Sequence, residues 1–286
     1  MQGTIIKGIG GLYFVKAADK NIYECKARGV FRKEKIKPMI GDRVEIELNG
    51  ETGIITEIEK RTSEFIRPPV ANIDTLAVVS SAADPQPDYY LTDKLLIMAE
   101  IRGIKPVICI TKTDLGSPDA FMEIYKNTGY RIFSVCSKTN EGIEAFLEFL
   151  KGKTTAFAGL SGVGKSSLLN HIVEDELKTG EISAKISRGR HTTRHVELFE
   201  LECGGFVFDT PGFSSFEPDA VKENELSLYF PEMRKYENQC RFNGCSHTHE
   251  PGCAVKEALS DGLISEQRYK NYCRIYEILK NHKDWD

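Results

Sequence analysis

Two hydrophobic patterns divide the chain. In residues 43–48, Val44, Ile46 and Leu48 alternate with charged residues, which is the period of a strand with one buried face. Similar short segments separated by turns occupy residues 3–10, 11–17, 21–27, 43–48 and 53–58. Five such strands predict a small all-β barrel, with the basic segment 32–37 between the third strand and the fourth. An SH3-like barrel that serves only as a spacer is the alternative.

After Arg67-Pro68-Pro69, strands alternate with helices. The predicted strands are residues 73–80, 106–110, 131–136 and 153–159, with two more near 195–201 and 204–208. The predicted helices are residues 88–103, 117–127, 142–152 and 165–172. This alternation predicts a parallel sheet covered on both faces. After about residue 222 it gives way to helical fragments and a closing helix over residues 265–282.

Composition and charge exclude some classes of protein. No apolar segment approaches the roughly 20 residues needed to cross a bilayer, and the N-terminus lacks the pattern of a secretion signal. We therefore expect no membrane insertion and a cytoplasmic location. The net charge of -4 does not favour nucleic-acid binding, but residues 1–68 carry 13 Lys/Arg against 10 Asp/Glu. Residues 178–194 carry five basic side chains against one acidic, so two local segments could contact phosphate.

A phosphate-binding loop is predicted where a strand meets a helix. The sequence GLSGVGKSS has the required glycine spacing, which lets backbone N–H groups point at a β-phosphate. Lys165 is expected to reach the β and γ oxygens and to act in catalysis, and the Ser166 hydroxyl to bind Mg²⁺. The predicted nucleotide-binding residues of this loop are Gly159, Leu160, Ser161, Gly162, Val163, Gly164, Lys165, Ser166 and Ser167. The alternative is a glycine-rich structural turn.

A strand ending in Asp-x-x-Gly follows the phosphate loop. In GFVFDTPGF, Asp209 is the predicted Mg²⁺ ligand, commonly through water, and the Gly212 N–H is predicted to meet the γ-phosphate. Taken alone, Asp-Thr-Pro-Gly is also a good turn sequence. Its distance from the phosphate loop favours the metal-binding role.

The polar segment 185–195 lies between these two motifs. Thr192 or Thr193 is predicted to bind Mg²⁺ there, with a solvated basic loop as the alternative. Phe213 occupies the position where Ras-like enzymes place a water-orienting glutamine. We therefore predict that His191 orients the attacking water. The alternatives are that His191 contacts RNA or caps the loop.

Guanine recognition is predicted from two segments that precede the phosphate loop. Thr111-Lys112-Thr113-Asp114 ends an apolar strand, and a carboxylate on Asp114 can accept from guanine N1–H and N2–H, which adenine does not offer. Lys112 would lie along the base plane. A second contact is predicted from Cys136, Ser137 and Lys138, which follow the next strand. This order is produced when the ends of a GTPase domain are joined and the chain is opened elsewhere.

Cysteines and histidines gather near the C-terminus. Cys240, Cys245 and Cys253 lie close together with histidines between them, which in a reducing compartment indicates metal ligation. Three thiolates and one imidazole complete a tetrahedral, structural Zn²⁺ site, with His247 or His249 as the fourth ligand. The remaining cysteines, expected to be packing residues, are Cys25, Cys109, Cys136, Cys203 and Cys273.

The motif order TKTD, CSKT, GLSGVGKSS, RGRHTT, DTPG resembles that of the circularly permuted RsgA family, also called YjeQ or YloQ, the ribosome small-subunit-dependent GTPases. Residues 61–74 look like that family's junction between an OB-fold and the GTPase domain. Residues 240–253 are similar to its Cys-x4-Cys-x-His-x5-Cys zinc site. The resemblance implies that the zinc ligands are Cys240, Cys245, His247 and Cys253. It also places His191 on the histidine of the switch motif.

The chain departs from the family's pattern at two positions. Thr111 stands where asparagine is commoner, so we expect a weaker tie between the guanine motif and the phosphate loop. Cys136-Ser137 stands where Ser-Ala is commoner. The contact expected of Ser137 is a backbone N–H, which this difference should preserve.

The expected fold is α/β with three domains. Residues 1–68 form an all-β OB-fold RNA-binding domain, residues 69–222 a circularly permuted P-loop GTPase domain with a parallel-rich sheet, and residues 223–286 a helical zinc-binding domain. The resemblance implies a GTP hydrolase that binds the small ribosomal subunit and its rRNA, assists its late maturation, and turns over GTP faster when bound. We expect one structural Zn²⁺, Mg²⁺ with GTP, and a monomer.

Other functions use the same motifs differently. The chain could be a nucleotide-gated RNA-binding module with incidental hydrolysis. It could be an ATP-using phosphotransferase, which Asp114 disfavours. A zinc-finger transcription factor is disfavoured because the Cys/His spacing leaves no recognition helix between ligand pairs.

Overall fold

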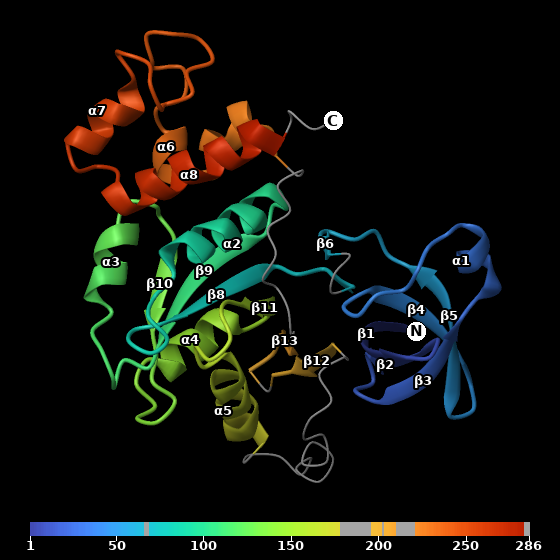
Figure 1. The fold of residues 1–286 in the computed structure, drawn as a ribbon. Helices are drawn as coiled ribbons and strands as arrows, with labels where there is room; N and C mark the ends of the chain where they lie inside the picture. Colours follow the sequence, from blue (N-terminus) through green and yellow to red (C-terminus); the bar gives the residue numbers. More distant parts are fainter. Residues whose placement is uncertain (66–68, 178–195, 202, 210–220, 283–286) are drawn as a thin grey trace. The chain divides into compact units, whose positions relative to one another are not determined.

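A computed structural model of the chain describes residues 1–65, 69–177, 196–201, 203–209 and 221–282 (Figure 1). The chain divides into two compact units. The first comprises Met1–Ala77, Ile143–Ala158 and Lys165–Phe213. The second comprises Val78–Gly142, Gly159–Gly164 and Ser214–Asp286. Within the described ranges, no helix has both the length and the apolar character required to cross a membrane.

The first unit begins with the predicted barrel. Its strands are β1 (Gln2–Ile9), β2 (Leu12–Ala17), β3 (Ile22–Ala27), β4 (Arg43–Asn49) and β5 (Thr52–Ile58). They close in the order β1-β2-β3-β5-β4, with β3 and β5 parallel, which is the arrangement of an OB-fold. The interior includes Ile5, Val15 and Val44, all fully buried. Leu48, which the alternation placed inside, is 41% exposed because the end of β4 runs beyond the packed interior.

Two local features of the barrel differ from the simple prediction. The helix α1 (Gly29–Lys33) occupies the start of the predicted basic loop. In β1, Ile5 pairs with Val15 and Lys7 pairs with Phe14, so one extra residue forms a bulge between them. A bulge bends its strand and changes the direction in which the following side chains point.

The barrel is tied to the segment that follows it. Arg61 forms ion pairs with the buried Asp42 at 2.8 Å and donates to the Lys37 carbonyl oxygen at 2.7 Å. The Asn72 amide donates to the Gly41 carbonyl oxygen at 2.9 Å. Between these residues, β6 (Glu64–Phe65) and β7 (Val70–Ala71) form a two-stranded antiparallel sheet. Arg61 and Asn72 therefore both bond the loop that precedes β4, at Lys37 and at Gly41.

The larger sheet contains β8 (Thr75–Ser81), β9 (Lys105–Thr111), β10 (Arg131–Ser134), β11 (Thr154–Ala158), β12 (Glu197–Glu200) and β13 (Phe206–Asp209). Its strand order is β10-β9-β8-β11-β13-β12. The pairs β9–β10 and β11–β13 are parallel, as predicted, and every residue of β8 is buried. The edge strand β12 is antiparallel to β13, because only a short turn joins them. Cys203, expected to be a packing residue, lies only half-buried in this turn, whereas Cys25, Cys109 and Cys136 are buried.

Helices follow the strands in the predicted order. They are α2 (Tyr89–Ile101), α3 (Asp119–Tyr125), α4 (Ile143–Leu150) and α5 (Lys165–Leu177). The Asp88 carboxylate accepts from the Leu91 N–H at 2.9 Å and caps α2, which explains why the helix begins one residue after the predicted start.

The C-terminal part of the second unit is helical. It contains η3 (Glu223–Tyr229), α6 (Pro231–Arg234), α7 (Ala254–Ser260) and α8 (Glu266–His282). In Figure 1, α8 lies along α2 and its beginning approaches α3. Phe230, Tyr272 and Ile97 belong to one apolar cluster, and half-buried Cys273 packs against it. Ile97 comes from α2, so this apolar cluster packs α2 against the C-terminal helices.

A buried ionic cluster crosses the same contact. Arg268 of α8 donates to Asp93 of α2 at 2.6 Å and to Glu232 of α6 at 2.7 and 3.0 Å. Tyr125 and Asn271 donate to the remaining capacity of Asp93 at 2.7 and 2.6 Å. Burial alone would lower the pKa of Arg268, but the two carboxylates raise it. The guanidinium is therefore charged and paired with two carboxylates inside the unit.

Candidate nucleotide and metal sites

The phosphate loop occupies the turn between the end of β11 and the start of α5. Gly159 has φ +145°, and a Cβ there would lie 2.1 Å from the Val79 carbonyl oxygen. Gly162 and Gly164 also have positive φ values, +81° and +96°. These positions explain the glycine spacing, because side chains at Gly159 would collide with the neighbouring backbone.

Thr111, the first residue of the guanine motif, contacts the phosphate loop directly. Its buried hydroxyl hydrogen-bonds to the Val163 carbonyl oxygen and lies 3.1 Å from the Ser80 carbonyl oxygen. A hydroxyl has one proton, so it can donate to only one of these carbonyls at a time. An asparagine amide has two N–H donors. Thr111 therefore keeps a contact with the loop with a smaller donor capacity.

Lys112 holds the next part of the loop. It has a left-handed backbone, with φ +57°, and its ammonium donates to the Gly162 carbonyl oxygen at 2.8 Å. Thr111, the last residue of β9, and Lys112 after it thus bond Val163 and Gly162 of the phosphate loop. The motif that precedes the loop in sequence is brought against it in space.

The two predicted guanine-reading segments also meet. The Lys138 ammonium lies 2.8 Å from an Asp114 carboxylate oxygen, and this hydrogen bond lowers the pKa of Asp114. The Asp114 carboxylate is therefore ionised and can accept from N–H donors. Cys136 is buried, and its N–H donates to the Glu141 carbonyl oxygen at 2.9 Å, which closes the second loop.

The predicted magnesium and catalytic residues are only partly described. Lys165 starts α5 half-buried, and burial lowers its pKa. Ser166 and Ser167 are exposed on the same first turn. Asp209 is the last residue of β13. The predicted residues His191, Thr192, Thr193 and Gly212 lie outside the described residues, as does the side chain of Asp209.

The Cys/His cluster fits a tetrahedral metal ion. The ligand atoms of Cys240, Cys245, His247 and Cys253 all lie within 4.8 Å of one another. His247 Nδ1 is 3.5 and 3.4 Å from the sulfurs of Cys240 and Cys253, and these sulfurs are 3.9 Å apart. Around a tetrahedral Zn²⁺, separations of about 3.6 Å for nitrogen to sulfur and about 3.8 Å between sulfurs are expected from the bond lengths.

The surrounding side chains fix the backbone of this cluster. His247 is buried with φ +60°, whereas His249 is exposed and outside the cluster, which favours His247 as the fourth ligand. Tyr269 and Tyr272 of α8 donate to the carbonyl oxygens of His247 and Ser246, each at 2.8 Å. Two tyrosine hydroxyl groups of α8 therefore hold the turn that carries His247.

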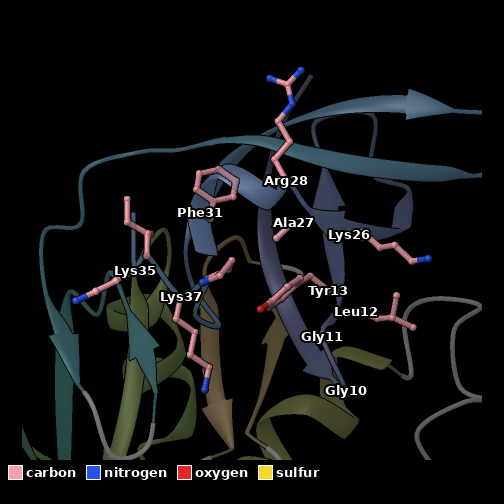
Figure 2. Close-up of a pocket in the computed structure, with 12 residues that line it drawn as sticks. Gly10, Gly11, Leu12, Tyr13, Lys26, Ala27, Arg28, Phe31, Lys35 and Lys37 are labelled. Carbon is pink, nitrogen blue, oxygen red and sulfur yellow. The ribbon is translucent and has the colours of Figure 1, made fainter. Parts of the chain in front are cut away.

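The barrel carries a basic hollow of about 630 Å³. It is lined by the β1–β2 turn, the end of β3, and α1 with the following loop. Figure 2 shows its basic side chains pointing in different directions around Tyr13 and Phe31; they are Lys26, Arg28, Lys35 and Lys37. The sequence indicated only the segment 32–37. The alternation of β1 to β3 gave no indication that the turn at Gly10 and Gly11 would join it.

Comparisons with known proteins agree with this geometry. A family model described as RsgA GTPase matches residues 58–219, and one described as RsgA N-terminal domain matches residues 2–55. A protein of Ruminiclostridium cellulolyticum named small ribosomal subunit biogenesis GTPase RsgA is 50% identical, covering 98% of this chain and 94% of the relative.

Two solved structures have the same fold. YloQ, described as a circularly permuted GTPase, has a TM-score of 0.83 at 38% identity and covers 98% of this chain and 95% of its own. YjeQ from Thermotoga maritima has a TM-score of 0.84 at 36% identity and covers 97% of this chain and 98% of its own. The predicted permuted order is confirmed, and the chain belongs to the RsgA GTPase family.

Proposed function

We propose that this chain is a GTP hydrolase that binds the small ribosomal subunit and its rRNA and assists the subunit's late maturation. The observation that carries the GTP part is the bonding of Thr111 and Lys112 to the phosphate loop, with Asp114 two residues further on. The base-reading carboxylate is thereby positioned relative to the loop that binds phosphate. The subunit part is supported by the name of a relative that is 50% identical.

The chemistry assigned to the site is phosphoryl transfer to water. Lys165 neutralises charge on the β- and γ-phosphates, and the Gly212 N–H donates to the γ-phosphate. Ser166, Asp209 and one of Thr192 and Thr193 would hold Mg²⁺, which would supply positive charge to the phosphate oxygens. His191 orients the attacking water. The Thr111 and Lys112 contacts hold the loop in place throughout.

Cys240, Cys245, His247 and Cys253 would together hold one structural Zn²⁺. The separations of their ligand atoms fit its bond lengths, and the set leaves no open coordination position. The purified chain should therefore contain one zinc ion per molecule by elemental analysis.

The barrel is the proposed rRNA contact. Its hollow combines lysine and arginine side chains with the half-buried ring of Tyr13, which suits the phosphates and bases of a single strand. We place the protein in the cytoplasm, where subunits are assembled, and propose that it acts as a monomer.

Base choice is tested by Asp114→Asn. The substitution removes the carboxylate that accepts from guanine, so GTP affinity should fall about 100-fold while ATP affinity stays low. Xanthosine triphosphate has a carbonyl at C2, to which an asparagine amide can donate, so it should bind the variant better than GTP does. A variant that binds GTP as tightly as wild type, or binds GTP better than xanthosine triphosphate, would contradict the role of Asp114.

The partner is tested by GTP turnover with and without purified small ribosomal subunits. Faster turnover with subunits is expected, and no stimulation at any salt concentration would remove the partner and leave only a GTPase. A non-hydrolysable GTP analogue separates a cycling enzyme from a binding module with incidental hydrolysis. The enzyme would stay on the subunit when it binds GTP without hydrolysing it, whereas the module would still complete its task.

A further inference from the structure

The β1–β2 hairpin belongs to two surfaces of the first unit. Its turn and the start of β2, residues 10–13, line the basic hollow. Its sides carry Lys7 and Lys16, which do not line the hollow. A two-stranded antiparallel ribbon moves as one piece because the ladder of hydrogen bonds joins its strands. A molecule bound at the turn therefore acts on the same element as contacts made by the two lysines.

Both lysines contact β12. The Lys7 ammonium lies 2.9 Å from Glu197, and the Lys16 ammonium lies 3.1 Å from Glu200. Lys7 follows the bulge in β1, which sets the direction of its side chain. These ion pairs are partly exposed, with the lysine side chains 33% and 20% accessible. Exposed pairs are weak, so they can rearrange when the hairpin shifts.

A second contact joins the hollow to β13. The loop that lines the hollow at residues 35–38 continues into Gly41, which packs against Phe208. A Cβ at Gly41 would lie 2.2 Å from the Ala71 carbonyl oxygen and 3.1 Å from the Phe208 ring. Phe208 is fully buried in β13 and directly precedes Asp209. Gly41, which follows this loop, is therefore closely packed against Ala71 and against the Phe208 ring of β13.

The β12–β13 hairpin receives both contacts. Its strands pair from Glu197 with Asp209 to Glu200 with Phe206, so Glu197 lies directly opposite the proposed Mg²⁺ ligand. Because Glu197 and Asp209 are paired, a movement of β12 at Glu197 would also move the end of β13 that carries Asp209.

We infer that Lys7 and Lys16 couple occupancy of the basic hollow by a single-stranded RNA to GTP turnover, through their ion pairs with Glu197 and Glu200. This inference rests on the proposed function and names the contacts through which RNA binding would change GTP turnover. The lysines are positioning residues, because they act on Asp209 through β12 and contact neither RNA nor nucleotide.

The test uses the full chain and measures two quantities for each variant. The first is the affinity for a fluorescent single-stranded RNA of about ten nucleotides, a length suited to one OB barrel. The second is GTP turnover alone, with this RNA, and with purified small subunits. In Lys7→Met/Lys16→Met we expect RNA affinity within about 2-fold of wild type, unchanged basal turnover, and stimulation reduced up to about 5-fold, which lies at the lower end of the usual range of coupling between sites.

Two further variants make the result specific. Lys60→Met removes a lysine charge from an exposed position of the same unit that does not line the hollow, and it should leave stimulation unchanged. Lys7→Glu combined with Glu197→Lys restores an ion pair with exchanged partners, and it should recover most of the stimulation. A merely structural role would instead change basal turnover or RNA affinity together with stimulation.

Each other outcome identifies what has failed. If wild type is not stimulated by RNA or subunits, both the partner and the coupling are wrong. If wild type is stimulated and the double variant is stimulated equally, only the coupling is wrong. If RNA affinity and stimulation fall together in the double variant, the lysines belong to the RNA-binding surface and the coupling is again wrong.

Discussion

The two units use opposite kinds of ion pair to hold one element against another. In the first unit, partly exposed lysines of the barrel form ion pairs with β12. In the second unit, the α8 guanidinium of Arg268 is buried among the carboxylates of α2 and α6. An exposed pair exchanges easily with water, whereas breaking a buried pair leaves an uncompensated charge. The β1–β2 hairpin is thus held to β12 by contacts that can change, whereas α8 is held by contacts that cannot change without loss of structure.

The strongest test of this difference is Arg268→Met. It leaves Asp93 and Glu232 buried without their cation, and we expect the free energy of unfolding to fall by about 3–5 kcal/mol. Urea denaturation followed by circular dichroism measures the change. Lys270→Met is the matched control on the same helix, because Lys270 is 69% exposed and pairs only with Glu266 at 3.4 Å among the contacts described. A loss below about 1 kcal/mol for Arg268→Met would remove the contrast between the units.

Thr111→Val tests an intermediate case, a buried contact without charge. The substitution keeps the shape but removes the hydroxyl bond to Val163, so nucleotide binding should weaken by about 1–2 kcal/mol, or roughly 10-fold. The dissociation rate of a fluorescent GDP analogue measures it, and Thr111→Ser should remain close to wild type.

Thr155→Val is the control for this substitution. Thr155 is also buried in a strand, but its hydroxyl has no hydrogen-bond partner among the described residues. Its replacement should leave the dissociation rate unchanged. Equal effects of the two valine substitutions would mean that the Val163 bond does not hold the phosphate loop.

The smallest effect is expected for the stability of Lys7→Met/Lys16→Met. Because both ion pairs are partly exposed, the free energy of unfolding should fall by less than about 1 kcal/mol. The same urea titration measures this change beside that of Arg268→Met. A loss as large as that of the buried cluster would show that the barrel is held as firmly as α8.

The sequence predicted those features that depend on local spacing. Val44 and Ile46 alternate with charged residues because one face of β4 is buried, and they lie inside as expected. The predicted metal ligands fall within residues 240–253, so their spacing alone indicated the cluster. The guanine motif was recognisable because it ends an apolar strand, and the structure places Thr111 and Lys112 against the phosphate loop.

Contacts between distant residues could not be predicted in this way. Arg268 and Asp93 are 175 positions apart, and each resembles an ordinary exposed charge on a helix until the helices pack. Lys7 and Glu197 are 190 positions apart, and their contact depends on where the barrel packs. The antiparallel direction of β12 depended on the length of a turn, which hydrophobic periodicity does not report.

The bulge in β1 also sets rules for insertions and deletions. Ile5 and Lys7 pair with the adjacent residues Val15 and Phe14, so the bulge absorbs one extra residue without changing the partner of Lys7. Side chains alternate between the two faces of a strand, so one residue inserted between Lys7 and the turn would instead turn Lys7 away from Glu197. Residues added in matched pairs nearer the turn would lengthen the hairpin and leave Lys7 on its present face. The reach of the hairpin can therefore be engineered, or can evolve, independently of the lysine contacts at its base.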